Sequence, residues 1–377
     1  MRRQQQRVRS SSSPSLVVAA SAASFPSSSS SPNRGDPADP RATTTSRVEA
    51  YLELARVHNI APALLLAIVG ASAAARSVPA ALLCPAVWAA AAASAGVSVA
   101  SAMVNDFFDR FGDAVNRPYK PIPDGRIQPD GAVLAAACVY IAVLATACLL
   151  DSRALRAVIA FSATATMAYT PFLKRVPLVK NLTVAAVIAL APVAGALAVS
   201  GGAGVAGAGV AAAGTEEAVR RLLPCAAFAF WGVVYREIIM DCHDLEGDLA
   251  DGVTTVPALV GRGGALAVAL ASLGAGAASA LALLYGGRLW GGQGLLLFEL
   301  PSATAAALGV FTGPVLAAVA AAPALLLIAF AAQCALLALG AARSGWEPAR
   351  VDDAVMACLK PMGLGIMMLA AVAAFGA

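Results

Sequence analysis

The chain has 377 residues, of which 59% are hydrophobic and only 13% are charged. A soluble domain of this size carries roughly a quarter charged residues, so the composition excludes a surface covered by water and favours a chain solvated by lipid. The net charge of +4 is small, and the sequence has no dense stripe of Lys and Arg with interleaved aromatic residues. A nucleic-acid partner is therefore not predicted.

Residues 1–46 form a separate region that is rich in arginine and serine. No acidic residue occurs before Asp36. This composition is typical of an organelle transit peptide, and a plain disordered tail is the alternative. The high serine content favours a chloroplast, in its envelope or thylakoid membrane, over the mitochondrial inner membrane. We therefore predict a transit peptide or disordered tail over 1–46 and one membrane domain over 47–377.

From about residue 48 onward, apolar runs of roughly 20 residues alternate with short polar breaks, which is the length needed to cross a bilayer as a helix. The nine candidate spans run near residues 50–75, 79–104, 131–150, 154–172, 178–199, 222–240, 263–286, 314–342 and 354–375. They are rich in alanine, and small residues let membrane helices approach closely. The predicted fold class is an all-α integral membrane protein. Lys and Arg are in excess in alternate loops. This excess places the loop between the second and third spans and the loop between the sixth and seventh spans on the cytoplasm-equivalent side, which is the stroma in a plastid.

Two acidic motifs share one spacing. Each has aspartates at offsets 0, 3 and 7, namely Asp106, Asp109 and Asp113 after the second span and Asp241, Asp244 and Asp248 after the sixth. At about 100° per residue these offsets fall within a roughly 60° arc of one helical face. The motifs are four spans apart, so both leave the membrane on the same side.

The helix C-terminus is the negative end of the macrodipole, so clustered acids there require cations. Carboxylate oxygens suit Mg²⁺, which proteins hold with a few carboxylates together with substrate phosphates. We therefore expect the two columns to hold Mg²⁺ and to bind a diphosphate. The alternative is that these are ordinary loop acids paired with nearby arginines.

Basic residues follow the first motif and the fourth span. Arg117, Lys120 and Arg126 lie in a proline-rich loop close enough in sequence to the first acids to bind phosphate oxygens. Setting the membrane topology is the other role open to them. Tyr169 and Lys174 follow the fourth span, where an interfacial aromatic anchor and a lysine that extends to the membrane surface are the alternatives.

At these residues the chain resembles the UbiA superfamily of intramembrane prenyltransferases. The resemblance covers roughly residues 48–377. It rests on the NDxxDxxxD pattern at 105–113, the RPxxPxPxGxI stretch at 117–127 and the segment from Tyr235 to Pro257. It implies a bundle of about nine transmembrane helices around a central cavity. It also implies an enzyme that transfers a prenyl group from an allylic diphosphate with the help of Mg²⁺.

The resemblance also implies roles for individual residues. The metal ligands would be the six motif aspartates, with Asp106, Asp109, Asp241 and Asp244 as the catalytic set and Asn105 assisting at the first site. The diphosphate would be engaged by Arg117, Lys120, Arg126 and Lys174. Three further residues look familiar for substrate binding, namely Asn59, Asn181 and Tyr169. Glu237, His243 and Asp248 are the candidates for a general base, and the sequence does not decide among them.

The sequence does not decide which molecule accepts the prenyl group. The plastid-like leader favours a lipophilic aromatic precursor of the quinone or tocopherol pathways. The loop after the first motif instead resembles chlorophyll synthases and digeranylgeranylglyceryl-phosphate synthases, which makes chlorophyllide and a glyceryl phosphate the alternatives. Two alternatives come from other classes of protein, a membrane transporter and a non-catalytic scaffold with the same fold. The acids at helix ends disfavour the transporter, and the intact acids of both motifs disfavour the scaffold. The sequence leaves the oligomeric state undecided.

Overall fold

The computed structural model describes residues 40–200, 215–250, 252–289 and 313–375. The chain divides into two units, Met1–Thr43 and Thr44–Ala377. Only residues 40–43 of the first unit are described, so the predicted transit peptide lies outside the described residues except for its last few positions. The features below belong to the second unit.

The described residues are helical and contain no strand. In chain order the elements are α1 (Pro40–Leu54), η1 (Val57–Asn59), α2 (Ile60–Ala75), α3 (Val78–Leu83), α4 (Pro85–Asn116), α5 (Pro129–Cys148), α6 (Arg153–Ala168), η2 (Tyr169–Leu173), α7 (Val179–Ser200), α9 (Thr215–Ala250), α10 (Val256–Leu289), α12 (Gly313–Arg343) and α13 (Pro348–Phe375). The predicted all-α membrane fold is confirmed.

Eight described helices are long and apolar enough to cross a membrane. They correspond to eight of the nine predicted spans. The remaining prediction, 154–172, falls on α6 and the π-helical turn η2, which together continue over residues 153–173. The second predicted span also begins late, because Cys84 is extended and separates the short α3 from α4.

Local sequence explains where several helices begin. The hydroxyls of Ser77 and Ser152 accept hydrogen bonds from Ala80 N and Leu155 N (3.2 Å each), which caps α3 and α6. Such caps satisfy amide groups that have no partner inside the helix. Pro129 starts α5 at a position where its missing N–H costs no hydrogen bond.

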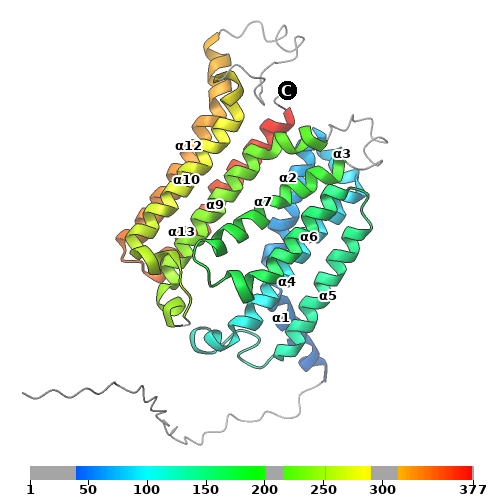
Figure 1. Cartoon of the computed structure of the whole chain (residues 1–377), viewed down its shortest axis with the longest axis vertical. Coiled ribbons are helices and arrows are strands. Elements are labelled where there is room, and N and C mark those ends of the chain that lie inside the picture. The colour runs from blue at the N-terminus through cyan, green and yellow to red at the C-terminus, as the bar shows by residue number, and fades with distance from the viewer. Residues whose placement is uncertain (1–39, 201–214, 251, 290–312, 376–377) are drawn as a thin grey trace, which may run out of the picture. The chain divides into compact units, whose positions relative to one another are not determined.

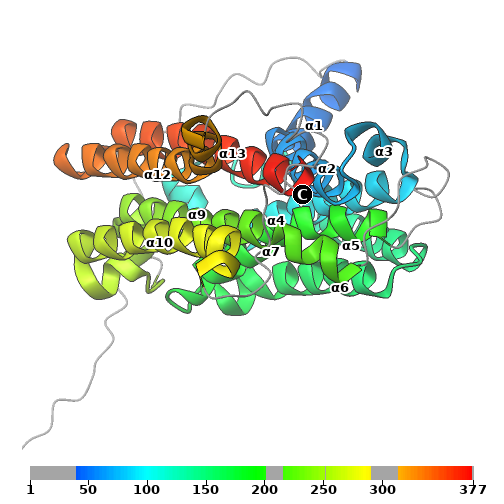
Figure 2. The ribbon, with the colours of Figure 1, turned by 90° about the horizontal axis from the view of Figure 1, so that it is seen from above.

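Close approach of helices holds the bundle together. Figure 2 shows α10 beside α9 and α12 beside α13, and α9 also contacts α7 and α13. Helices α2 and α7 approach very closely at two glycines. A β-carbon on Gly70 would lie 1.9 Å from Pro192 O, and one on Gly195 would lie 1.8 Å from Ala67 O. Only glycine fits at these two positions, as small residues do at many membrane helix interfaces.

The interior is built mainly from alanine, whereas large apolar side chains such as Leu134, Ile141, Leu325 and Leu336 are exposed. Such an outer surface suits hydrocarbon rather than water, where large contiguous apolar patches are rare. The C-terminal ends of α4 and α9 lie at the same end of the bundle (Figure 1). This arrangement brings both acidic motifs to one end of the membrane domain.

Candidate active site

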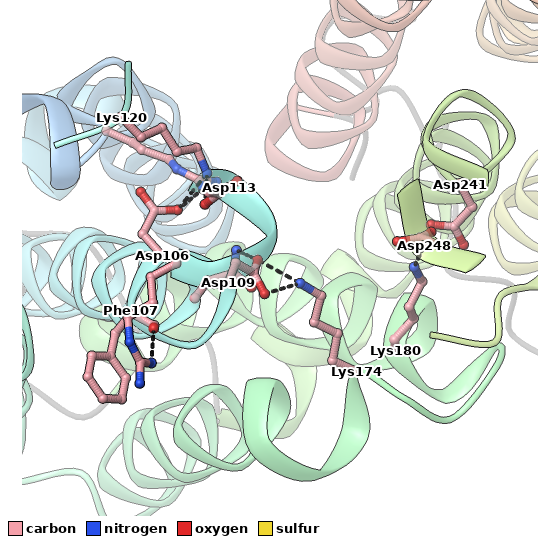
Figure 3. A network of polar contacts seen from close by, with 12 residues as sticks. Asp106, Phe107, Asp109, Asp113, Lys120, Lys174, Lys180, Asp241 and Asp248 are labelled. Atoms are coloured by element: carbon pink, nitrogen blue, oxygen red, sulfur yellow. Dashed lines mark hydrogen bonds and ion pairs between the residues drawn. The ribbon is translucent and has the colours of Figure 1, made fainter. Parts of the chain in front are cut away.

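The first acidic motif forms the last turns of α4. The helix continues unbroken to Asn116, so the aspartates lie on one face as their spacing predicts. Lys120 shows this directly, because its Nζ lies 3.1 Å from Asp106 Oδ1 and 2.7 Å from Asp113 Oδ2. Both carboxylates are buried, and a single ammonium group in the following loop binds them together (Figure 3).

Two further cations reach the first motif from distant parts of the chain. Arg56, in a left-handed backbone conformation before η1, donates from Nη2 to Asp106 Oδ1 at 2.7 Å. Lys174, directly after η2, donates to both carboxylate oxygens of Asp109 at 2.6 Å each. Asn105 Nδ2 adds a hydrogen bond to Asp109 Oδ2 at 2.8 Å. Three cations therefore balance the three acids of this motif.

The second acidic motif lies in the last turns of α9 and faces the start of α7. Lys180 Nζ lies 2.7 Å from Asp241 Oδ1 and 3.9 Å from Asp248 Oδ2. Asn181 Nδ2 donates to the other oxygen of Asp241 at 3.0 Å. Lys180, Asn181 and Asp241 are all buried. Asp244 is more exposed and contacts the ring Nδ1 of His243 at 2.9 Å.

The two motifs meet through basic residues. Arg117, which caps the C-terminus of α4, places Nη2 3.9 Å from Asp244 Oδ1 of the other motif. Lys174 points toward Asp109 in Figure 3. Tyr169 begins η2, which packs against α4, α6 and α7. The structure thus brings together both acidic columns, Arg117, Lys120, Lys174, Tyr169, Asn105 and Asn181.

The donor chemistry of this region fits a divalent cation. Two buried oxygens at the second motif, Asn181 Oδ1 and Asp248 Oδ2, accept no hydrogen bond. Buried acceptors of this kind are costly unless a donor or a cation satisfies them. Within the described residues, no three carboxylate, His or Cys side chains converge on a single point that would hold a metal. Basic side chains lie among the acids instead, so metal binding requires some of these side chains to move.

Two predicted site residues lie apart from this network. Arg126 was expected to engage the diphosphate, but it bonds to Glu53 Oε2 (2.7 Å), to Tyr119 O (2.8 Å) and to Asp124. The hydrogen bonds that Arg126 donates to the carboxylates of Glu53 and Asp124 raise its pKa above the usual value. These bonds tie the loop to α1, and the predicted contact with the diphosphate stays a prediction. Asn59 is exposed at the end of η1, and none of the described motif acids bonds to its side chain.

Two residues of this network, Arg56 and Lys180, were given no site role from the sequence. Lys180 is buried in the first turn of α7. An ionisable residue inside an otherwise apolar span is a signal that could have identified it. Arg56 carried no such signal, because its partner Asp106 is 50 residues away.

The three candidates for a general base also have definite positions. Glu237 lies one helical turn before Asp241 and binds Arg236 Nη1 at 2.8 Å. His243 contacts Asp244, and Asp248 faces Lys180. None of these side chains is distinguished from the others by its contacts alone, so the base stays a prediction.

Known proteins match both the sequence and the fold. The model of the UbiA prenyltransferase family matches residues 63–312. A digeranylgeranylglyceryl phosphate synthase from Methanopyrus kandleri is 33% identical over 59% of this chain and 73% of its own length. A synthase of the same name from Methanoculleus marisnigri is 32% identical over 65% of this chain and 79% of its own length. A UbiA homologue from Archaeoglobus fulgidus bound to GPP and Mg²⁺ superimposes with a TM-score of 0.53 and 18% identity. The match covers 86% of this chain and 98% of the homologue.

Proposed function

The chain belongs to the UbiA prenyltransferase family, and on this premise we propose that it transfers a prenyl group from an allylic diphosphate to a glyceryl phosphate lipid. It is an integral membrane prenyltransferase. The observation that carries the proposed site is the contact between the motifs, with Arg117 of the first lying 3.9 Å from Asp244 of the second. Acids and bases from distant helices thus surround one small region at a helix end, which suits a polyanion held through metal ions.

The relatives favour one acceptor over the others. Both curated relatives described above are digeranylgeranylglyceryl phosphate synthases. By the chemistry of that product, the acceptor would be geranylgeranylglyceryl phosphate and the donor geranylgeranyl diphosphate. From the sequence alone, a glyceryl phosphate acceptor is one of the alternatives. The preference for an aromatic quinone or tocopherol precursor rested on the leader, and no relative described above supports it.

The chemistry follows from charge. The bond between C1 and the diphosphate oxygen breaks, the diphosphate leaves with the electron pair, and the acceptor hydroxyl forms a new bond to C1 and loses its proton. Lys120, Lys174 and Arg117 lie beside the acids on loops and at a helix end, where their side chains can turn to phosphate oxygens. They would stabilise the negative charge that develops on the leaving group. The prenyl tail would lie among apolar helices, where each buried methylene contributes about 0.8 kcal/mol.

Magnesium is the metal that this donor set would hold. Asp106, Asp109 and Asp113 of α4, together with Asp244 and Asp248 of α9, offer carboxylate oxygens near the region where the motifs meet. When bound there, Mg²⁺ would neutralise the diphosphate and so make it a better leaving group. Both oxygens of Asp241 already have partners, Lys180 and Asn181.

The plastid location is proposed from residues 1–46 alone. The curated relatives described above are archaeal proteins, so they do not bear on a transit peptide. A fluorescent fusion of residues 1–46 tests the location directly. Import into chloroplasts is the expected result, and retention in the cytosol would refute it.

The activity is tested with the full chain in lipid nanodiscs. The protein is incubated with Mg²⁺, labelled geranylgeranyl diphosphate and one of three acceptors: geranylgeranylglyceryl phosphate, homogentisate or chlorophyllide. We expect label in the glyceryl lipid alone and none when EDTA is present. Label in the product of homogentisate or chlorophyllide would overturn the proposed acceptor but not the proposed prenyl transfer. Absence of diphosphate release with every acceptor would overturn the enzyme proposal as a whole.

A further inference from the structure

Lys180 and Asp241 form the most enclosed ion pair at the candidate site. The exposed fraction of the Lys180 side chain is 9%, and that of Asp241 is 8%. The basic partners at the first motif are more open, with 14% for Lys120, 22% for Lys174 and 36% for Arg56. A buried ion pair resists separation, because removing one partner leaves an uncompensated charge.

The turn before α7 fixes where Lys180 stands. Leu178 has a φ of 64°, a left-handed conformation that is rare for a residue with a branched side chain. Val179 N bonds to Pro177 O at 2.8 Å, and α7 begins directly afterwards. The side chains of Lys180 and Asn181 are therefore attached to the first turn of a helix, whereas that of Lys174 is attached just after the irregular turn η2.

These two neighbours occupy both oxygens of one carboxylate. Lys180 takes Asp241 Oδ1 at 2.7 Å, and Asn181 donates to Oδ2 at 3.0 Å. By contrast, Asp248 Oδ2 lies 3.9 Å from Lys180 and accepts no hydrogen bond, and Asn181 Oδ1 is also without a donor. The oxygens of the second motif that remain open thus belong to residues other than Asp241.

We propose that Lys180 is a resident cation that keeps Asp241 out of the metal site. Asp241 is then a positioning residue that holds Lys180 and Asn181, and the metal at the second motif depends on Asp244 and Asp248. The proposal rests on the metal-dependent function proposed above. It replaces the sequence-based assignment of Asp241 as a ligand.

Charge arithmetic provides a matched test. The three acids of the second motif and Lys180 sum to −2 when all are charged (−3 + 1). The double variant Lys180→Met/Asp241→Asn also sums to −2, from Asp244 and Asp248 alone. The two proteins therefore differ in whether Asp241 is present but not in the net charge that attracts a metal ion.

The experiment measures Mn²⁺ binding to the full chain in nanodiscs by electron paramagnetic resonance. The double variant should bind Mn²⁺ within about twofold of wild type, since no ligand has been lost. Lys180→Met alone frees Asp241 and adds one negative charge, so it should bind about tenfold more tightly. Lys180→Arg keeps the cation and should match wild type. The Stokes radius and helix content of each variant confirm that it is folded.

The outcomes separate this inference from the proposed function. If Asp241 is a ligand after all, the double variant will bind at least about tenfold more weakly than wild type, and the inference is overturned. Unchanged binding in Lys180→Met would overturn it as well. Asp244→Asn is the control for the metal site itself. If it does not weaken Mn²⁺ binding, the proposed metal site fails, whatever the double variant does.

Discussion

The two acidic motifs are built alike but closed differently. In each, a lysine lies over the first and third aspartates, Lys120 at the first motif and Lys180 at the second. Lys120 comes from the loop after α4, and the other cations of that motif also come from irregular segments. Lys180 comes from a helix and is buried. The same spacing of acids therefore has partners from irregular segments at the end of α4 and a buried partner from a helix at the end of α9.

This difference indicates that the two motifs have different roles in binding the substrate. Basic side chains on irregular segments can exchange a carboxylate for a phosphate oxygen when a diphosphate arrives, because no packed helix holds their backbone. A lysine in the first turn of a packed helix cannot do so without disrupting the helix interface. We infer that the first motif adjusts to the substrate and that the second provides a preformed surface. Five predictions test this comparison.

The largest effect is expected when either motif loses an acid of the proposed metal site. Asp106→Asn and Asp244→Asn should each lower turnover by about 1000-fold, since removal of one preorganised electrostatic group commonly costs a factor of 100 to 1000. Turnover is measured with labelled geranylgeranyl diphosphate, and circular dichroism checks that the helices persist.

The double variant Asp106→Asn/Asp244→Asn tests whether the two motifs act as one site. Groups that act as a unit are strongly non-additive, so the double variant should be no more than about tenfold worse than the worse single variant. Losses that multiply fully would show that the two motifs act independently.

The next effect concerns the loop-borne cations. Lys120→Ala should weaken binding of the diphosphate about 30-fold, because hydrogen bonds to charged groups contribute roughly 1.5–3 kcal/mol. Titration with a non-hydrolysable thiolodiphosphate analogue measures the binding. Lys120→Arg is the matched control and should recover most of the affinity. Weaker Mn²⁺ binding with unchanged affinity for the analogue would contradict a role in holding the substrate.

A smaller effect is expected at the contact between the motifs. Arg117 and Asp244 are 3.9 Å apart and part-exposed, so solvent and salt screen their attraction. Arg117→Ala should lower kcat/KM about threefold to tenfold at low salt, mainly through contacts with the diphosphate. The loss should shrink as ionic strength rises. A loss that does not vary with salt would indicate that Arg117 acts through structure instead.

The smallest effect is expected at Arg126, which the sequence placed with the substrate. Its partners Glu53 and Asp124 are also part-exposed, so Arg126→Ala should cost less than about 1 kcal/mol of stability. The kcat/KM value should fall by less than about threefold. A loss as large as that of Lys120→Ala would return Arg126 to the diphosphate site. Thermal unfolding in detergent measures the loss of stability, and Glu53→Gln, which removes the charge of the partner, is the matched variant.

The sequence by itself determined the features that depend on local geometry. Apolar runs of the right length predicted the membrane helices, because a backbone in hydrocarbon has to satisfy its own hydrogen bonds. Acids at offsets 0, 3 and 7 share a face of any α-helix, so both columns followed from spacing alone. The family could be recognised from the same residues.

Only the tertiary structure decided which cation faces which acid. Lys174 and Asp109 are 65 residues apart, and Asn181 and Asp241 are 60 apart. Their meeting depends on how α7 packs against α9 and on where irregular turns such as Leu178 direct the chain. For the same reason, the sequence did not show that Arg126 bonds to Glu53 of α1 or that Lys180 is buried. Charge pairing over such separations is set by helix packing, which the pattern of residue types along one chain does not encode.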